Sequence, residues 1–227
     1  MATRQPLNRD RVFGAAVALA DEHGIAGLTM RALAQRLGVK PMAVYHYLDG
    51  KEQILDGIVD AVFSEIPLPR PGQSWRDELS VRAHALRLAL GRHPWAIGLL
   101  ESRARPGAAT LAQHDAVLGV LFDAGFSVPL AAHAYALVDS YVYGFALQEA
   151  TLPIGPDPQE SAAEVVAGVE ATYPHLTRFA IELVTPDYRF ADEFDFGLAV
   201  VLDGIETALI AAAHSTMGPV CPKGQPV

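Results

Sequence analysis

The stretch that most restricts the possible folds is residues 29–48, TMRALAQRLGVKPMAVYHYL. Thr29 is a good N-cap residue, and apolar side chains recur after it at helical spacing as far as Leu37. Gly38 then permits a tight turn, and a second short helix is expected over 41–47. Two short helices joined by a tight turn form the helix-turn-helix pattern.

The second of these helices has an inner and an outer side. Val44 and Leu48 are spaced so that both face the core. The residues left facing outward are Lys40, Pro41, Met42, Tyr45, His46 and Tyr47. An outward side of this size fits the major groove of DNA and offers both hydrogen bonds and apolar contacts to bases.

A short helix pair with a glycine turn also occurs in helical bundles that bind no DNA. Two observations favour DNA here. Exposed tyrosines such as Tyr45 and Tyr47 need a partner, and tyrosine hydroxyls commonly contact phosphate. Lys51 opens the following helix, where a cation opposes the positive end of the helix dipole but suits a DNA phosphate. The pattern therefore predicts a DNA-binding domain.

The remainder of the chain also has helical patterning, with no convincing run of strand residues. We expect an all-α protein with a three-helix helix-turn-helix domain over 1–50 and a connecting helix over 51–66. A helical ligand-binding and dimerisation domain is expected over 67–214, and a disordered tail over 215–227. The helices of the second domain are predicted over 74–93, 94–104, 108–124, 129–151, 160–172, 174–184 and 192–214.

The net charge of −9 looks unsuitable for a DNA-binding protein, but this charge is unevenly distributed. Residues 1–57 hold seven basic and six acidic side chains, whereas the remainder holds ten basic and twenty acidic ones. A nearly neutral first part can still make specific contacts, while non-specific attraction of the whole chain to DNA is weakened.

The cellular location follows from cysteine use and hydropathy. The single cysteine, Cys221, and the lack of a secretory signal indicate a reducing cytoplasm. The apolar run over 196–213 is interrupted by Asp203 and Glu206, so we interpret it as a buried helix rather than a membrane span. We expect a cytoplasmic protein with no membrane partner.

The last predicted helix has two apolar faces, which require packing partners on both sides. One face carries Phe194, Leu198, Leu202, Ile205 and Leu209. The other carries Gly197, Val200, Val201, Gly204, Ala208 and Ala211. A fully internal helix of one subunit would satisfy this pattern, but the small side chains also favour close approach of a second subunit. We expect a homodimer whose seam includes the helix over 129–151, and a palindromic DNA operator to match its symmetry.

A candidate effector site lies on the helix over 129–151. Tyr135, Asp139 and Tyr143 share one face of it, and a buried aspartate needs a hydrogen-bonding partner. Either the three side chains face an open pocket for a mostly hydrophobic small molecule, or a tyrosine or arginine supplies the partner and the cluster belongs to the core or dimer seam. The predicted ligand-binding residues are Trp95, Leu99, Leu118, Phe122, Tyr135, Asp139 and Tyr143.

Enzymatic and metal chemistry have no signature in the sequence. We find no nucleophile elbow, glycine-rich phosphate loop or paired-carboxylate pattern, and the histidines lack metal-site spacing. We therefore expect no catalytic residues, no metal and no cofactor. An all-helical enzyme of another type is the alternative.

Residues 10–60, especially GIAGLTMRALAQRLGVKPMAVYHYLDGKEQILD, resemble the DNA-binding domain of tetracycline-repressor-type regulators. More weakly, QSWRDEL at 73–79 and FDFGLAVVLDGIETAL at 194–209 resemble the C-terminal domain of the tetracycline repressors. The resemblance implies a homodimeric DNA-binding regulator, expected to be a repressor that a small-molecule inducer releases from its operator. A regulator of the same fold controlled by a partner protein is the alternative.

The resemblance also implies roles for individual residues. Those matching family contacts to the DNA backbone are Thr29, Arg31, Tyr45, Tyr47 and Lys51, and those matching residues that face bases are Lys40, Pro41, Met42, Ala43 and His46. The tetracycline repressors hold their drug as a magnesium chelate through a histidine and a glutamate. Here these positions fall near Leu100 and Gln148, which would not chelate in that way, although Glu101 and Glu149 stand beside them. This departure from the family's pattern argues against tetracycline itself as the effector.

Overall fold

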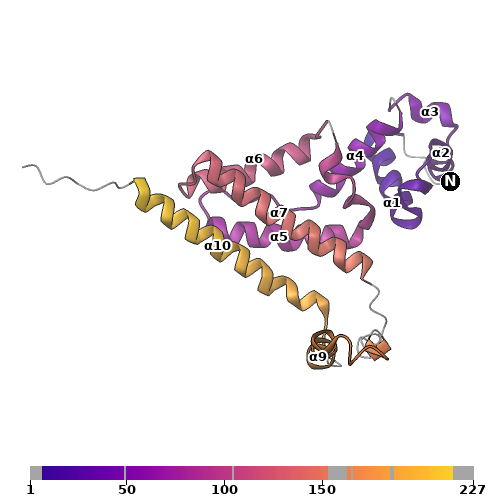
Figure 1. The fold of residues 1–227 in the computed structure, drawn as a ribbon. Helices are drawn as coiled ribbons and strands as arrows, with labels where there is room; N and C mark the ends of the chain where they lie inside the picture. Colours follow the sequence, from indigo (N-terminus) through magenta and orange to yellow (C-terminus); the bar gives the residue numbers. More distant parts are fainter. Residues whose placement is uncertain are drawn as a thin grey trace, which may run out of the picture.

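The helix-turn-helix pattern occupies one end of a wholly helical arrangement (Figure 1). The computed structural model describes residues 7–48, 50–103, 105–152, 163–164, 166–184 and 187–216. The described α-helices are α1 (Arg9–Gly27), α2 (Met30–Leu37), α3 (Pro41–Tyr45), α4 (Lys51–Ser64), α5 (Trp75–Arg92), α6 (Ala108–Asp123), α7 (Val128–Thr151), α9 (Pro174–Leu183) and α10 (Glu193–Thr216). Three short 3-10 segments are η1 (Pro94–Ala96), η2 (Leu100–Ser102) and η3 (Phe190–Asp192).

Local capping determines the shape of the first domain. The Thr29 hydroxyl accepts a hydrogen bond from the backbone N–H of Ala32 at 3.1 Å and so caps α2. Gly38 ends α2 in the left-handed conformation, with φ 67° and ψ 34°, which lets α3 turn sharply away. Gly24 also has positive φ, 66°, and kinks α1, which then continues to Gly27. The turn and its flanking helices are therefore built by the residues that the sequence singled out.

The segment 94–104 differs from the single helix expected there. It forms the two short segments η1 and η2 instead. The residue before a proline avoids helical geometry, and His93 accordingly has φ −125° and ψ 62°, which ends α5 and starts a new direction. The helix expected over 160–172 is found only at 163–164 and 166, because residues 167–172 form turns. Helix α10 continues to Thr216, past the start of the tail expected over 215–227, and 217–227 lie outside the described residues.

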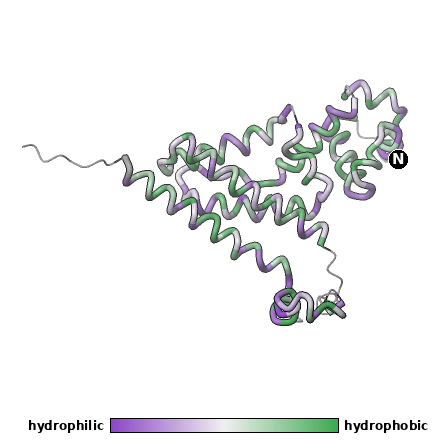
Figure 2. The backbone as a smooth tube through the Cα atoms, in the orientation of Figure 1, coloured by the Kyte–Doolittle hydropathy of each residue, from purple (hydrophilic) through white to green (hydrophobic). Residues whose placement is uncertain are grey.

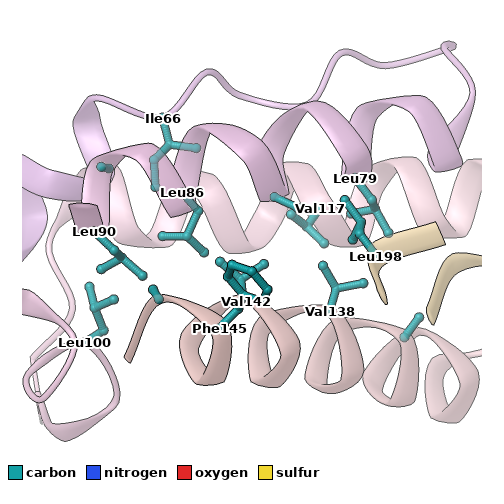
Figure 3. Close-up of a cluster of buried hydrophobic side chains, with 14 of the residues drawn as sticks. Ile66, Leu79, Leu86, Leu90, Leu100, Val117, Val138, Val142, Phe145 and Leu198 are labelled. Atoms are coloured by element: carbon teal, nitrogen blue, oxygen red, sulfur yellow. The ribbon is translucent and has the colours of Figure 1, made fainter. Parts of the chain in front are cut away.

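The connecting helix α4 contributes to two hydrophobic cores. Its Ile54 and Ile58 pack with α1, α2 and α3, in a core that also buries Val44 and Leu48. Its Val62, one turn further on, belongs to the second core. That second core runs along α5, α6, α7 and α10, and Figure 3 shows part of it, including Ile66, Leu79, Leu86, Leu90, Leu100, Val117, Val138, Val142, Phe145 and Leu198. Helix α4 therefore belongs structurally to both domains.

Helix α10 packs on α7 and lies along one side of the subunit (Figure 1). Figure 2 shows that it is largely hydrophobic although it lies at the outside. Its inward face buries Phe194, Leu198, Leu202 and Ile205. Its outward face leaves Phe196 74%, Val200 54% and Ile210 53% exposed. By length and hydropathy alone the segment Phe190–His214 could span a membrane, a test that core helices also pass. Only 17% of its most apolar window is buried, so the helix expected to be buried over 196–213 is buried on one face only within the subunit.

A buried ion pair joins α5 to α7. Arg82 Nη1 donates to Asp139 Oδ1 at 2.6 Å and Nη2 to Oδ2 at 3.3 Å, and both side chains are buried. The Tyr143 hydroxyl donates to Asp139 Oδ2 at 3.4 Å, and the Tyr135 ring lies 5.4 Å from the guanidinium. Burial is the largest influence on the pKa of the Arg82 guanidinium and lowers it, but the charge and hydrogen bonds of Asp139, together with Tyr135 and Tyr143, raise this pKa above its usual value.

We predict that Asp139→Asn lowers the free energy of unfolding by roughly 3–5 kcal/mol, because it leaves the Arg82 cation buried and uncompensated. Urea unfolding at a fixed protein concentration measures this loss. The double variant Arg82→Met with Asp139→Leu should recover most of it, since apolar groups of similar volume need no partner. A stability equal to that of the wild type in Asp139→Asn would contradict a structural role and favour an open pocket at Asp139.

Candidate functional site

The outer side of α3 and its flanks form an exposed surface that we call the recognition surface. Met42 is 69% exposed, Tyr45 47% and Tyr47 38%, while Val44 and Leu48 beneath them are buried. The other predicted DNA-binding residues on this surface are the exposed Thr29, Arg31, Lys40, Pro41, His46 and Lys51, and the half-buried Ala43. The structure thus brings all ten predicted DNA-binding residues to the turn, to α3 and to the starts of α2 and α4.

The charges near the recognition surface divide into paired and unpaired groups. Arg36 on α2 donates to both carboxylate oxygens of Glu22 at 2.6 and 2.7 Å, which lowers the pKa of Glu22. Among the described side chains, Arg31, Lys40 and Lys51 have no carboxylate within 4.0 Å. Three unpaired cations beside exposed tyrosines suit the phosphates of a DNA backbone.

The predicted ligand-binding residues do not converge on one centre. Tyr135, Asp139 and Tyr143 gather around Arg82, so an arginine supplies the partner that the buried aspartate needs. Trp95 lies elsewhere, at the domain junction, where its indole N–H donates to Asp21 at 2.6 Å.

The three remaining predicted positions also lie apart. Leu99 is half-buried and borders both cores, whereas Leu118 is half-buried against the second core alone. Phe122 on α6 is 43% exposed. None of the seven predicted residues lines the four cavities described for this chain.

A cavity of about 290 Å³ lies between α4 and α6, under the segment 100–107; we call it the α4–α6 cavity. Its apolar lining comes from Val59, Phe63, Leu100, Pro106 and Leu111, and its polar lining from Asp56, Arg103, Arg105, Thr110 and His114. A more open crevice of about 620 Å³ adjoins it, sharing Asp56, Arg103, Arg105 and Gly107, and reaches Arg9 and Phe13 on α1. The sequence did not predict either hollow, because their linings come from separate segments of the chain.

Two contacts tie the walls of the α4–α6 cavity to the rest of the molecule. Asp60 on α4 accepts from the backbone N–H and the hydroxyl of Thr110 at 2.8 and 2.9 Å, and so caps the start of α6. The His114 ring stacks on Tyr135 with ring centres 5.2 Å apart, which connects this cavity with the Arg82 cluster. A change in the spacing of α4 and α6 would therefore alter both the Asp60–Thr110 contact and the His114–Tyr135 stack.

Within the described residues, no three His, Cys, Asp or Glu side chains are grouped so that they could hold a metal ion.

Both parts of the chain are similar to parts of known proteins. Residues 12–58 match the model of bacterial regulatory proteins of the tetR family, and residues 68–209 match the tetracyclin repressor-like C-terminal domain. The HTH-type transcriptional repressor DrrR1 of Streptomyces coeruleorubidus is 32% identical over 225 residues, covering 94% of this chain and 82% of that protein. The class A tetracycline repressor from transposon 1721 of Escherichia coli is 33% identical over 206 residues, covering 88% and 90%.

A solved structure agrees in fold as well as in sequence. The crystal structure of a possible TetR family transcriptional regulator from Streptomyces coelicolor A3(2) superposes with a TM-score of 0.72 at 32% identity, covering 88% of this chain and all of that one. Members of the family are DNA-binding regulators rather than enzymes, with an N-terminal helix-turn-helix and a C-terminal ligand-binding domain. This chain therefore belongs to the tetR family of bacterial regulatory proteins and is a ligand-responsive, DNA-binding transcriptional repressor.

Proposed function

We propose that this repressor acts as a homodimer that binds a palindromic operator and is released from it by a mostly hydrophobic small molecule. The observation that carries the proposal is the position of α4, which packs in the core of the DNA-binding domain and also forms a wall of the α4–α6 cavity. A molecule in that cavity would contact the helix that carries the recognition surface. Control by a partner protein is the alternative, and it predicts no release by any small molecule.

The recognition surface supports two kinds of DNA contact. Tyr47 and Lys51 lie at its edge, beside the start of α4, where they suit phosphates. Met42 and His46 lie on α3 and at its end, exposed to the position that a major groove would take. In a dimer, two such helices would enter successive major grooves about 34 Å apart.

We predict that Lys51→Ala and Tyr47→Phe weaken binding to all DNA sequences, whereas Met42→Ala and His46→Ala change base preference. Selection of bound sequences from random DNA, followed by electrophoretic shifts, measures both effects. Losing one phosphate contact should also reduce the slope of log affinity against log salt by about 1. Arg36→Ala, which removes a cation already paired with Glu22, is the control and should leave this slope unchanged. If both groups of variants altered specificity alike, the assigned roles would be wrong.

The exposed faces of α7 and α10 support the dimer. The outward face of α10 exposes Phe196, Val200 and Ile210, and on α7 Leu137 and Leu147 are about half exposed. Contiguous apolar faces of this kind mark protein–protein contacts rather than solvent-exposed surface. The small residues Gly204, Ala208 and Ala211 on α10 permit close approach of a partner helix.

We predict that Gly204→Arg yields a monomer that binds the operator at least a hundredfold more weakly. A Cβ at Gly204 meets no atom within 4 Å in the subunit, so the substitution leaves the single chain intact. Light scattering measures the mass, and circular dichroism checks the fold. Gly119→Arg on α6 is the matched control, because its Cβ also points into open space. An unaltered dimer in Gly204→Arg would place the seam elsewhere.

The α4–α6 cavity supports an effector of modest size. Its volume is near the lower end of ligand pockets, and its lining combines apolar side chains with a few polar groups. Thr110 and His114 supply such polar groups beside Phe63. The ion-paired Asp139 lies behind this wall and is proposed to support it through Tyr135 rather than to face the effector.

We predict that Leu111→Trp raises the effector concentration needed for operator release at least tenfold. Leu111 lines the cavity and is 56% exposed, so an indole can reach into it without disturbing the core. Compounds that release the wild-type protein from its selected operator are titrated against both proteins. Leu68→Trp, at a half-exposed linker position, should release like the wild type. An unchanged release curve for Leu111→Trp would move the effector site away from this cavity.

A further inference from the structure

His93 lies where three elements of the two domains meet. It follows α5 directly, and its side chain reaches between α1 of the DNA-binding domain and the end of α4. Its Nδ1 lies 2.7 Å from Asp21 Oδ1 on α1, and its Nε2 lies 3.0 Å from Glu65 Oε1 at the C-cap of α4. The residue is only 7% exposed. We call His93, Asp21 and Glu65 the clasp.

The geometry of the clasp determines the charge of the imidazole. A neutral imidazole has one N–H, and its other ring nitrogen accepts. A carboxylate is an acceptor only, so a neutral His93 would place a lone pair against either Asp21 or Glu65. Both contacts are hydrogen bonds only when His93 carries both ring protons. The doubly hydrogen-bonded form of the clasp is therefore the form that contains the imidazolium.

The neighbouring groups hold both carboxylates in place. The indole N–H of Trp95 donates to Asp21 Oδ1 at 2.6 Å, and Arg92 donates to Glu65 Oε2. Burial raises the pKa of Glu65, but the hydrogen bonds from Arg92 and His93 outweigh it and lower this pKa below its usual value, so Glu65 stays charged near neutral pH. Arg92, Asp21 and Glu65 are the charged side chains that contact or adjoin the imidazole.

The clasp also connects the two domains. Asp21 lies on α1, which packs in the core of the DNA-binding domain, and His93 ends α5, which packs in the second core. The backbone at His93 is non-helical, with φ −125° and ψ 62°, so α5 ends there and the ring lies against Asp21 of α1. Histidine is the side chain type whose change of charge falls in the physiological pH range.

We propose that His93 is a positioning residue that holds the DNA-binding helices against the regulatory domain only while it is protonated, so that operator affinity depends on pH through this one imidazole. Deprotonation removes one charge-assisted hydrogen bond, to Asp21 or to Glu65, and turns it into a repulsion. The effect on DNA rests on the proposed function, whereas the opening of the clasp does not.

Glu65→Gln is the decisive variant. Its amide N–H₂ can donate to Nε2 of a neutral His93, while its amide oxygen still accepts from Arg92 and His93 Nδ1–H still donates to Asp21. The clasp in Glu65→Gln should therefore stay closed at every pH of the test. His93→Gln removes the titrating ring, and His23→Gln on α1, an exposed histidine beside Glu22, is the matched control.

The first readout is independent of DNA. The chain has two tryptophans, so protein labelled with ¹⁵N-tryptophan gives two indole signals, and Trp75→Phe assigns them. Between about pH 6 and about pH 8.5 the Trp95 signal should shift in the wild type and in His23→Gln, while the Trp75 signal stays in place. The Trp95 shift should be absent in His93→Gln and in Glu65→Gln. A Trp95 signal that stays constant in the wild type, or that shifts equally in His93→Gln, would overturn the proposal.

The second readout is the ratio of operator affinities at these two pH values. It should be about tenfold in the wild type, the value of one charge-assisted hydrogen bond, and no more than about twofold in Glu65→Gln. His46 on the recognition surface is unaltered in both proteins, so the difference between them isolates the clasp. An equal ratio in the two proteins would overturn the link to DNA binding. If no protein bound DNA at any pH, the proposed function would fail, while the indole signals would still decide whether the clasp opens.

Discussion

The structure depends most on the division of α4 between two cores. Ile58 is fully buried in the core of the DNA-binding domain, and its neighbour Val59 is buried in the core of the regulatory domain. Protein interiors are close-packed, so a rotation or tilt of α4 cannot be absorbed by either core alone. A displacement of α4 would therefore also displace the recognition surface at its start. The packing of α4 alone therefore couples the position of the DNA-binding domain to that of the second domain, with or without an effector.

This constraint also limits what an effector must do. Shifting a two-state dimer from almost wholly competent to almost wholly incompetent requires about 5.5 kcal/mol of difference in binding. A pocket remote from the moving helix would have to transmit that difference through intervening side chains. In the α4–α6 cavity, Val59 and Phe63 are themselves part of α4, and Asp60 caps α6 across the gap. A molecule that separates these helices would act on the moving element directly.

The sequence predicts well whatever is determined locally, and poorly what distant residues supply. The cap at Thr29, the turn at Gly38 and the buried Val44 each follow from neighbours within a few positions, and all are present. In contrast, Asp139 finds its partner in Arg82, 57 residues away, and His93 is held by Asp21, 72 residues away. Periodicity showed that Asp139 needed a partner but not which one. The cavity was missed because its walls come from separate segments that each look like ordinary core.

The distribution of charge explains how an acidic protein can read DNA. In the regulatory domain, several arginines are paired with carboxylates of the same domain: Arg70 with Glu78, Arg76 with Asp203, Arg82 with Asp139 and Arg87 with Glu149. Arg76, Arg82 and Arg87 join α5 to α10 or α7, and Arg70 joins the linker to α5. The surplus of acidic groups repels a polyanion. Arg31, Lys40 and Lys51, which have no carboxylate partner among the described side chains, are gathered on the recognition surface. Because non-specific affinity for DNA comes almost entirely from phosphate neutralisation, this division weakens binding to random sequence more than binding to the operator. Acidity of the regulatory domain therefore raises the ratio of specific to non-specific affinity, which is the quantity that determines occupancy of a single site in a genome.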